Sequence, residues 1–369
     1  MIASPFFEER HRAAAALAET LGADLEHEED PRRIVVSLGK TGLLAHCVPA
    51  EFGGAQTSVE GRSLCAIRRA LGYRSSLVDT MFAMQGLGSY PVTLAGSDAQ
   101  RRQLLPRVAM GTAICAFAIT EPGAGSDVAA LATIARRDGE DYLLDGEKSF
   151  ISNAGIADAY VVFARTSDEK HRGLSAFLVG GDARGLAVTP IELIAPHPIG
   201  RVRFSEVRVP ASSRIGAEGE GFSLAMTTLD RFRPSVGAAA AGMAARALDE
   251  AIARVKTRRQ FGRALAEFQA TQLALAEMAV DLATADLLVA AAAFAGDGAG
   301  PKTCVAAMAK LHATEAAGRV IDRALQLHGG EGVVRGTVVE RLYREVRALR
   351  IYEGTSEIQK LVIARELLR

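Results

Sequence analysis

The sequence has no tryptophan, and aromatic residues of all kinds make up only 5% of its 369 positions. Aliphatic side chains and alanine must therefore fill the core. An excess of either charge is also lacking, because Lys and Arg total 43 and Asp and Glu total 43. A chain without net charge lacks the bulk attraction that holds proteins on nucleic acid or on an anionic membrane. We therefore expect no nucleic acid and no membrane among its partners.

Cysteine is scarce, since the chain has only Cys47, Cys65, Cys115 and Cys304 and no CxxC pair. Thiols so few and so scattered exclude a disulfide scaffold and favour a reducing compartment. The N-terminal residues include acids and no apolar run of the signal-peptide kind. The longest uncharged stretch, residues 80–97, contains a glutamine, three glycines and a proline, which makes it too polar and broken to span a membrane. These absences predict a soluble, cytoplasmic protein.

Several signatures of nucleotide, metal and hydrolase sites are also missing. No GxGxxG occurs, so a Rossmann site is unsupported, and neither HExxH nor GxSxG is present. Gly39-Lys40-Thr41 resembles the end of a P-loop, but Ile34 stands where the first glycine is required. The seven histidines show no spacing typical of metal ligands, so we expect no metal site.

Hydrophobic patterning changes twice along the chain, which is long enough to form more than one core. Residues 1–115 carry helical patterns, with apolar residues three or four positions apart. Residues 116–212 instead contain short β-rich segments without helices between them, which favours an antiparallel barrel or sandwich. The expected strands are residues 142–151, 159–166, 174–179, 186–193 and 202–209.

Residues 213–369 return to helical patterns that are broken at glycine-rich points. A regular alternation of three- and four-residue steps predicts the seam of a helical bundle. The residues of this predicted seam are Leu273, Ala276, Val280, Ala283 and Leu287. The predicted fold class is α+β, mainly α, with an N-terminal helical domain, a middle antiparallel β-barrel-like domain and a C-terminal four-helix-bundle domain.

The most distinctive segment is residues 117–127, with the sequence FAITEPGAGSD. A β-like run enters a glycine-rich turn that carries hydroxyl groups at Thr120 and Ser126. Such a turn exposes backbone N–H groups to the oxygens of a ligand. On composition alone, a plain tight loop is the favoured interpretation of the segment.

Three further motifs follow in order: Arg258-Arg-Gln-Phe261-Gly262, Gln326-Leu-His-Gly329-Gly330 and Ile351-Tyr-Glu-Gly-Thr-Ser-Glu-Ile-Gln359. Together with residues 117–127, their order and spacing resemble those of the acyl-CoA dehydrogenase family, and the resemblance covers nearly the whole chain. It implies an FAD cofactor laid between the β domain and the C-terminal bundle. It also agrees with the helical–β–helical order, which corresponds to domains at residues 1–115, 116–212 and 213–369.

The resemblance implies two groups of FAD contacts. Around the flavin ring it places Phe117, Ile119, Thr120, Ser126, Phe150, Ile151 and Ser152. Phe150 would cover one edge of the ring, although an ordinary strand residue facing the core is the alternative. The remaining contacts would be Arg258, Phe261, Gln269, Gln326, Gly329, Gly330, Thr355 and Glu357. In this family several of these come from a neighbouring subunit, which implies a homo-oligomer, a dimer of dimers.

Glu353 aligns with the glutamate of the family's Tyr-Glu-Gly-Thr motif, and the resemblance implies that it is the catalytic base. It would remove the proton α to the thioester carbonyl, while a hydride passes from the β-carbon to the flavin. A carboxylate beside an apolar acyl chain has a raised pKa, which makes it a stronger base. Asp230 is the alternative base. The implied substrate contacts are Ser126, Asp230, Arg233 and Gly354.

The function implied by this resemblance is FAD-dependent dehydrogenation of an acyl-CoA to the trans-2-enoyl-CoA, with electrons passed to an electron-transferring flavoprotein. Flavin-dependent relatives remain alternatives, namely an oxidase, a desulfinase, a monooxygenase or a dehydrogenase of carrier-protein-bound acyl groups. A non-catalytic flavin-binding or CoA-binding protein is a further one. Residues 195–201, APHPIGR, depart from the Gly-x-Arg-x-Ser loop of many relatives, which leaves the acyl group open.

Overall fold

The computed structural model describes residues 5–298 and 302–368. Contacts between Cα atoms divide the chain into two compact units of interleaved segments. The first, which we call the helical unit, comprises Met1–His27, Gly61–Asp79 and Asp230–Arg369. The second, which we call the β unit, comprises Glu28–Glu60 and Thr80–Leu229. Each unit is described separately below.

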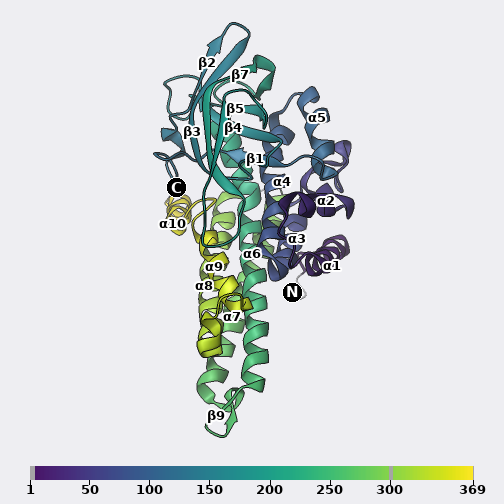
Figure 1. Ribbon diagram of the computed structural model, residues 1–369, viewed down its shortest axis with the longest axis vertical. Coiled ribbons are helices and arrows are strands. Elements are labelled where there is room, and N and C mark those ends of the chain that lie inside the picture. Colours follow the sequence, from purple (N-terminus) through teal and green to yellow (C-terminus); the bar gives the residue numbers. More distant parts are fainter. Residues whose placement is uncertain (1–4, 299–301, 369) are drawn as a thin grey trace. The chain divides into compact units, whose positions relative to one another are not determined.

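The helical unit is dominated by three long helices, α6, α7 and α8, that lie side by side in Figure 1. Its helices are α1 (Glu9–Asp24), α3 (Gly61–Arg74), α6 (Gly221–Thr257, from Asp230 onward), α7 (Gln269–Asp297), α8 (Thr303–His328), α9 (Val338–Val346) and α10 (Ser356–Leu367). Alanine supplies much of the core, as expected for a chain poor in aromatics. A Cβ atom on Gly72 would lie 2.6 Å from the carbonyl oxygen of Ala239, so α3 and α6 require glycine at this crossing.

The predicted bundle seam on α7 is wrong, because its larger members face solvent. Leu273, Val280 and Leu287 are 59%, 65% and 45% exposed. The buried face of α7 instead consists of Ala274, Met278, Ala285, Val289, Ala290, Ala292 and Ala293. Small side chains let helices approach closely, so the alanine-rich face packs inward and the stripe of larger residues is left outside.

Within the described part of the chain, α7 is also long and apolar enough to cross a membrane by length and composition, a test that core helices of soluble proteins pass too.

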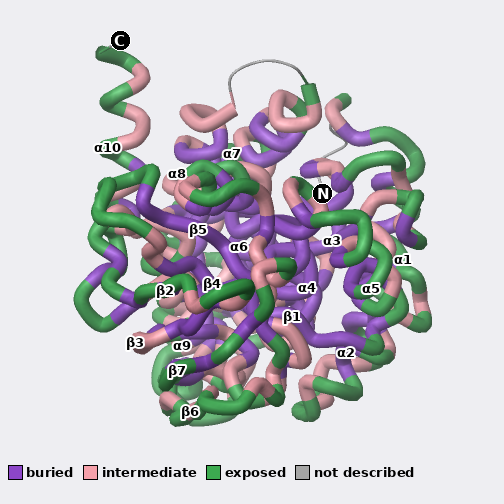
Figure 2. Tube along the Cα trace, turned by 90° about the horizontal axis from the view of Figure 1, so that it is seen from above, coloured by how far each residue is buried: buried purple, intermediate pink, exposed green. Residues whose placement is uncertain are grey.

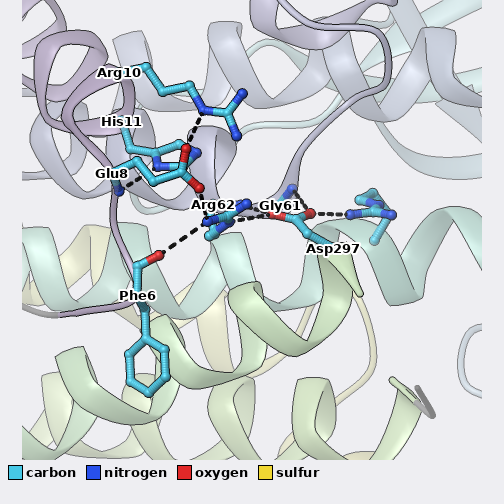
Figure 3. Close-up of polar contacts among 8 residues, drawn as sticks. Phe6, Glu8, Arg10, His11, Gly61, Arg62 and Asp297 are labelled. Atoms are coloured by element: carbon cyan, nitrogen blue, oxygen red, sulfur yellow. Dashed lines mark hydrogen bonds and ion pairs between the residues drawn. The ribbon is translucent and has the colours of Figure 1, made fainter. Parts of the chain in front are cut away.

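A salt-bridge network centred on Asp297 ties four segments of the helical unit together (Figure 3). The Asp297 carboxylate accepts hydrogen bonds from the backbone N–H of Gly61 at 2.6 Å and from Arg62 Nε at 3.0 Å. It also accepts one from Arg231 at 2.7 Å, and Arg62 reaches Glu8 at 2.7 Å. Charge-assisted hydrogen bonds of this kind are stronger than neutral ones. They fix the N-terminal segment and the start of α3 against α6 and α7.

The β unit contains α2 (Pro31–Lys40), most of α4 (Ser76–Ala95), α5 (Asp98–Ala109) and one sheet of eight strands. The strands are β1 (Cys115–Ala118), β2 (Ile134–Asp138), β3 (Asp141–Ser152), β4 (Ala159–Arg165), β5 (Leu174–Gly180), β6 (Leu186–Pro190), β7 (Ile199–Pro210) and β8 (Arg214–Ile215). The strand order is β6-β7-β3-β2-β4-β5-β8, and β1 pairs in parallel with β4. The predicted fold class is confirmed, with mostly antiparallel pairing in the middle segment.

All five predicted strands form within a few residues of their expected bounds, and β1 overlaps the start of the β-like run in residues 117–127, but β2 and β8 were not predicted. β1 is buried at every position, so it lacks the alternation that marks a half-exposed strand. β2 carries the charged sequence ARRD, which reads as a loop. In Figure 2, β4 and β5 include long buried stretches, whereas α10 at the C-terminal end is mostly exposed or intermediate.

Candidate functional site

The loop between α9 and α10 holds Glu353 in an unusual backbone conformation. Glu353 has a φ of 52° and Gly354 a φ of 92°, both in the left-handed region. A non-glycine residue there costs of order 1–3 kcal/mol and persists only when its surroundings hold it. Lys310 Nζ donates to the Gly354 carbonyl at 2.8 Å, and Gln359 Nε2 donates to it at 3.0 Å. The Glu353 carbonyl accepts from Gln359 at 3.2 Å and from Arg233 Nε at 3.3 Å, so both carbonyls of the turn are clamped.

The side chain of Glu353 is poised to accept a proton. Its Oε2 atom is buried and has no hydrogen-bond partner among the residues described. Burial raises the pKa of this carboxyl, and the positive charges of Arg68, Lys310 and Arg233 oppose the rise. A desolvated carboxylate with one uncommitted oxygen has the properties of a general base.

Asp230, the alternative base, is differently placed. One of its oxygens accepts a short hydrogen bond from Arg233, and the other accepts from Thr303 Oγ1 at 2.6 Å. Both carboxylate oxygens are therefore engaged, whereas Glu353 keeps one free. The structure brings Asp230, Arg233, Glu353 and Gly354 together, and within this group the hydrogen bonding favours Glu353 as the base.

Two buried cations near Glu353 were missed by sequence reasoning. Arg68 on α3 is 2% exposed and makes a bidentate ion pair with Asp79, at 2.9 and 2.8 Å, and a bond to Ser235 Oγ at 2.9 Å. Lys310 on α8 has no exposed surface. Each interrupts the apolar face of its helix, and that interruption was the available signal.

Thr355 and Glu357 lie at the start of α10. The hydroxyl of Thr355 caps this helix by accepting a hydrogen bond from the backbone N–H of Ile358 at 3.3 Å. Glu357 in the first turn is exposed. Their expected contacts with FAD stay predictions, and the capping gives Thr355 a local structural role as well.

In the β unit, a buried ion pair anchors the segment that carries Thr120. Lys148 Nζ lies 2.7 Å from Glu121 Oε1 and donates to the Ile119 carbonyl at 3.1 Å. The Glu121 carboxylate also accepts from the backbone N–H groups of Ala132 at 2.6 Å and Thr133 at 2.9 Å. Residues 117–127 are therefore more than a plain tight loop, because a buried charge pair holds them against β3.

Phe150 is presented to solvent by a strained backbone. Its φ is 55° and its side chain is 58% exposed, although it lies within β3. The register of β3 against β7 shifts between Lys148 and Ile151, and the backbone N–H of Ser149 turns to the Thr120 carbonyl at 2.8 Å. The alternative of a strand residue facing the core is therefore wrong. Strain that exposes a flat aromatic side chain is typical of a binding site.

Ser152 has an unforeseen partner in the divergent 195–201 segment. Its Oγ lies 2.8 Å from His197 Nε2, and which atom donates depends on the tautomer of the ring. Burial lowers the pKa of His197 to about 4, so the ring is neutral near pH 7. No role was predicted for this histidine from the sequence, because the pairing depends on the way the segment folds back.

The remaining ring residues differ in exposure. Phe117 and Ile151 are core residues, 6% and 1% exposed, and the Phe117 ring packs on Phe163 with centroids 4.9 Å apart. Their side chains are buried, so their expected contacts with FAD stay predictions. Ile119 and Thr120 are partly exposed, and Ser126 is exposed in the glycine-rich turn.

The other predicted FAD contacts gather at the end of the bundle away from α10 (Figure 1). Arg258 follows α6, and the hairpin of β9 (Arg259–Gln260) and β10 (Arg263–Ala264) carries Phe261 at its turn. Phe261 is 92% exposed, with a φ of 52°. Gln269 begins α7, and Gln326, Gly329 and Gly330 lie at the end of α8. A hydrogen bond of 3.4 Å from Arg254 to the His328 carbonyl places these two helix ends side by side.

This end of the bundle lies far from Glu353 within one chain. Arg233 in α6 and Arg258, whose N–H still bonds to the last turn of α6, are 25 positions apart, which corresponds to roughly 37 Å at about 1.5 Å per residue. Arg233 contacts the Glu353 loop, so the Arg258 group and the Glu353 group of one chain are set well apart. Within the helical unit the predicted site residues thus form two groups, around Glu353 and Arg258, and the residues around Phe150 belong to the β unit.

The chemistry of these groups fits FAD. The exposed Phe150 offers a flat apolar face, and Thr120, Ser126 and Ser152 offer hydroxyls for the polar edge of a flavin ring. Open space surrounds Gly329 and Gly330, so a ligand can approach their backbone closely, and the guanidinium of Arg258 suits a pyrophosphate.

Three family models match consecutive parts of the chain. Residues 6–112 match the N-terminal domain, residues 116–207 the middle domain and residues 219–368 the C-terminal domain of acyl-CoA dehydrogenase. Together they cover most of the sequence, and their order is that of the helical–β–helical pattern. The predicted resemblance is confirmed.

Individual proteins agree with the family models. The chain is 38% identical over 364 residues to cyclohexane-1-carbonyl-CoA dehydrogenase of Geobacter metallireducens, covering 98% of this chain and 94% of that protein. A chain of the solved structure "Electron transferring flavoprotein of Acidaminococcus fermentans: Towards a mechanism of flavin-based electron bifurcation" has a TM-score of 0.95 and 33% identity, with 100% of both chains covered. A glutaryl-CoA dehydrogenase from Mycobacterium smegmatis in complex with FADH2 has a TM-score of 0.92 and 28% identity, covering 99% of this chain and 96% of that one.

Proposed function

The chain belongs to the acyl-CoA dehydrogenase family, and from this premise we propose that Glu353 is the base that removes the α-proton of the acyl-CoA. The enzyme is an FAD-dependent oxidoreductase that dehydrogenates acyl-CoA thioesters and passes the electrons to a flavoprotein. Bound FAD, held by residues such as Phe150, Thr120 and Ser152, would supply the acceptor for the hydride of the β-carbon. The observation that carries the role of Glu353 is its buried Oε2 without a partner, in a turn whose carbonyls are clamped.

The residues around Glu353 have different roles in the proposed proton transfer. The clamp on the Glu353 and Gly354 carbonyls leaves the side chain directed by a fixed backbone. Burial keeps water from competing for the proton and makes the carboxylate a stronger base. Asp230 holds Arg233 in place through its hydrogen bond, and its expected contact with the substrate stays a prediction.

Anaerobic mixing of the purified holoenzyme with a panel of acyl-CoAs tests this function. Wild-type enzyme should bleach its flavin with its best substrate. Glu353→Gln should slow bleaching by about 10²–10⁴-fold or more, because the amide cannot take the proton, while the thioester still binds. Glu51→Gln, a change at an exposed glutamate, is the matched control. Wild-type bleaching in Glu353→Gln would show that the base lies elsewhere, with Asp230 tested next.

Reoxidation of the bleached enzyme tests the acceptor. We propose that electron-transferring flavoprotein is the natural partner, and the supporting observation is the match at TM-score 0.95 to a chain from a structure described by that name. Reduced enzyme should then transfer electrons rapidly to a purified electron-transferring flavoprotein and slowly to oxygen. Rapid reoxidation by oxygen alone would instead identify an oxidase.

We further propose that the enzyme is a homo-oligomer, a dimer of dimers. The separation of roughly 37 Å between the Arg258 and Glu353 groups supports this, because two copies can join the groups that one chain holds apart. Phe261 supports it too, since a strained aromatic residue that is 92% exposed is costly unless a partner covers it.

The outer face of α7 supplies a second supporting surface. Two members of its exposed stripe, Leu273 and Val280, line a groove of about 640 Å³ between α7 and α8, and Leu287 continues the stripe along α7. The groove also contains charged residues, including the ion pair of Asp281 with Arg319 at 2.7 Å. An apolar stripe rimmed by charge is typical of a protein interface.

Light scattering at several protein concentrations tests the oligomer. Val280→Glu should shift the enzyme toward smaller species, because it buries an unpaired charge in the proposed interface. Thr20→Glu, at an exposed threonine of α1, serves as the comparison. A stable monomer with full FAD occupancy in the wild type would contradict the proposal.

A cytoplasmic location is also proposed. All four cysteines are free, and three of them are buried, which suits a reducing compartment. Fractionation of the source cells with an antibody to the enzyme tests this, and recovery from a membrane or extracellular fraction would contradict it.

A further inference from the structure

Lys310 is a buried cation without a counterion. It lies in the middle of α8 on the alanine-rich face that packs into the bundle, and its side chain has no exposed surface. Its ammonium donates to the Gly354 carbonyl at 2.8 Å. No carboxylate of the described residues lies within ion-pair distance of it. Burying a charged ammonium costs several kcal/mol, and one carbonyl bond does not offset that cost.

The other two cations near Glu353 have counterions of their own. Arg68 is paired with Asp79 through two hydrogen bonds. Arg233 is paired with Asp230. Arg68 has the largest effect of the three positive charges that act on Glu353, but among them only Lys310 lacks a counterion within the described residues.

Lys310 therefore has two effects on the Glu353 loop. Its hydrogen bond fixes the Gly354 carbonyl, which helps to hold Glu353 in its left-handed conformation. Its positive charge favours the ionised form of the Glu353 carboxylate and opposes the effect of burial. A base must be ionised before it can accept a proton, so the second effect bears directly on the reaction.

We propose that Lys310 is a positioning residue of the reaction, which clamps the Glu353 turn and supplies the counter-charge that keeps Glu353 ionised near neutral pH. The proposal rests on the proposed role of Glu353 as the base. Lys310 itself contacts the loop and does not need to touch the substrate.

Charged side chains from several helices surround Glu353 and Lys310. Glu353 is faced by Arg68 from α3, Asp79 from α4, Arg233 from α6 and Lys310 from α8. Lys310 is faced by Glu353, by Arg233 from α6, by Glu357 from α10 and by Glu315 from its own helix. Glu315 is already bound to Ser356 at 2.6 Å and to Arg350, and Glu357 is exposed. Glu353 is therefore the carboxylate on which the positive charge of Lys310 acts.

Two substitutions separate the charge of Lys310 from its hydrogen bond. Lys310→Met keeps the length and removes both, whereas Lys310→Gln retains a donor for the Gly354 carbonyl without the charge. The holoenzymes are compared by the pH dependence of anaerobic flavin bleaching. The acid limb of the profile should move up by about 1–3 pH units in both variants, because an opposite charge nearby lowers a carboxyl pKa by this amount. Lys310→Gln should approach the wild-type rate at high pH, and Lys310→Met should stay slower there.

Infrared difference spectra provide a readout that does not depend on turnover. Wild-type minus Glu353→Gln spectra of the holoenzyme give the titration of the Glu353 carboxyl, and the same subtraction in the Lys310→Met background should show a higher midpoint. Lys40→Met, at an exposed lysine of α2, should leave both profiles unchanged. Thermal unfolding and FAD content confirm that each variant is folded.

The outcomes separate this inference from the base assignment. An unchanged acid limb in both Lys310 variants, or an equal rate loss at every pH, overturns the role of Lys310 while Glu353 stands. Normal bleaching in Glu353→Gln overturns the base assignment first. An upward shift in both variants, absent from Lys40→Met, supports the proposal.

Discussion

Two fully buried lysines, Lys148 in the β unit and Lys310 in the helical unit, are each linked to a non-glycine residue in the left-handed conformation. Lys148 precedes Phe150 by two residues in β3, and Lys310 donates to the residue that follows Glu353. Their counterions differ. Lys148 lies 2.7 Å from Glu121, whereas Lys310 has no ion pair within the described chain.

The difference shows two ways of holding a strained functional residue. In the β unit the ion pair is complete in itself, so it supports a neutral, aromatic surface at Phe150. In the helical unit Lys310 has no counterion, and its charge acts on the carboxylate of Glu353, the residue that it positions. Burial lowers the pKa of each lysine to about 8, so burial alone does not distinguish the two sites.

The largest expected effect is a loss of stability in Lys148→Met. This change leaves the Glu121 carboxylate buried without its partner, and breaking a buried pair from one side costs about 3–5 kcal/mol in the free energy of unfolding. Lys310→Met leaves no buried carboxylate without an ion-pair partner. It should lower the free energy of unfolding by about 1 kcal/mol or less, or raise it. Denaturant unfolding of the two FAD-loaded variants against wild type measures both.

A double substitution is the control for this contrast. Lys148→Met combined with Glu121→Leu removes both charges and should recover most of the stability lost in the single variant. Equal losses in Lys148→Met and Lys310→Met would show that the two lysines have the same structural role.

The sequence predicted the strained residues of both sites but not their supports. Phe150 and Glu353 stand in recognisable motifs, because each belongs to a short segment whose residues are expected to contact the ligand together. Lys310, Arg68 and His197 come from segments far away in the chain, and only tertiary packing brings them in. Within its own segment of the sequence, none of these three polar residues stands out.

Tertiary packing also explains why the bundle seam predicted on α7 is wrong. Periodicity identifies the apolar positions of a helix, but α7 is apolar on two faces, and the pattern does not state which of them meets its own chain. The larger residues were assigned inward, whereas alanines occupy the buried face because the neighbouring helices lie close. Sequence reasoning therefore predicted the fold class and the helix itself, and packing decided the face.

A smaller effect is expected in the pH dependence of stability. Burial lowers the pKa of Lys310 to about 8 in the folded protein, against about 10.4 for an unfolded lysine. Between these values the unfolded chain binds more protons than the folded one, so the free energy of unfolding should rise with pH. Lys310→Met lacks this contribution. The difference between wild type and variant should therefore grow by at most about 1.4 kcal/mol per pH unit above pH 8.

Denaturant unfolding at pH 7.5, 8.5 and 9.5 checks this difference. Lys148 titrates in the same range, but it is present in both proteins and its contribution cancels in the subtraction. A difference that stays constant across this range, or that shrinks as the pH rises, would contradict the depressed pKa of Lys310.

The smallest expected effect separates ligand binding from packing at Phe150. Phe150→Gly relieves a left-handed backbone at a position that is 58% exposed, while glycine adds conformational freedom to the unfolded chain. The two terms are similar in size, so the free energy of unfolding of the FAD-free protein should change by about 1 kcal/mol or less. The dissociation constant for FAD should rise about 2–10-fold, since a pair of stacked rings contributes about 0.5–1.5 kcal/mol. Phe163→Ala, at a ring only 1% exposed in the same sheet, should show the opposite balance and cost about 3–5 kcal/mol of stability. A loss of stability in Phe150→Gly as large as that in Phe163→Ala, with unchanged FAD affinity, would make Phe150 a packing residue.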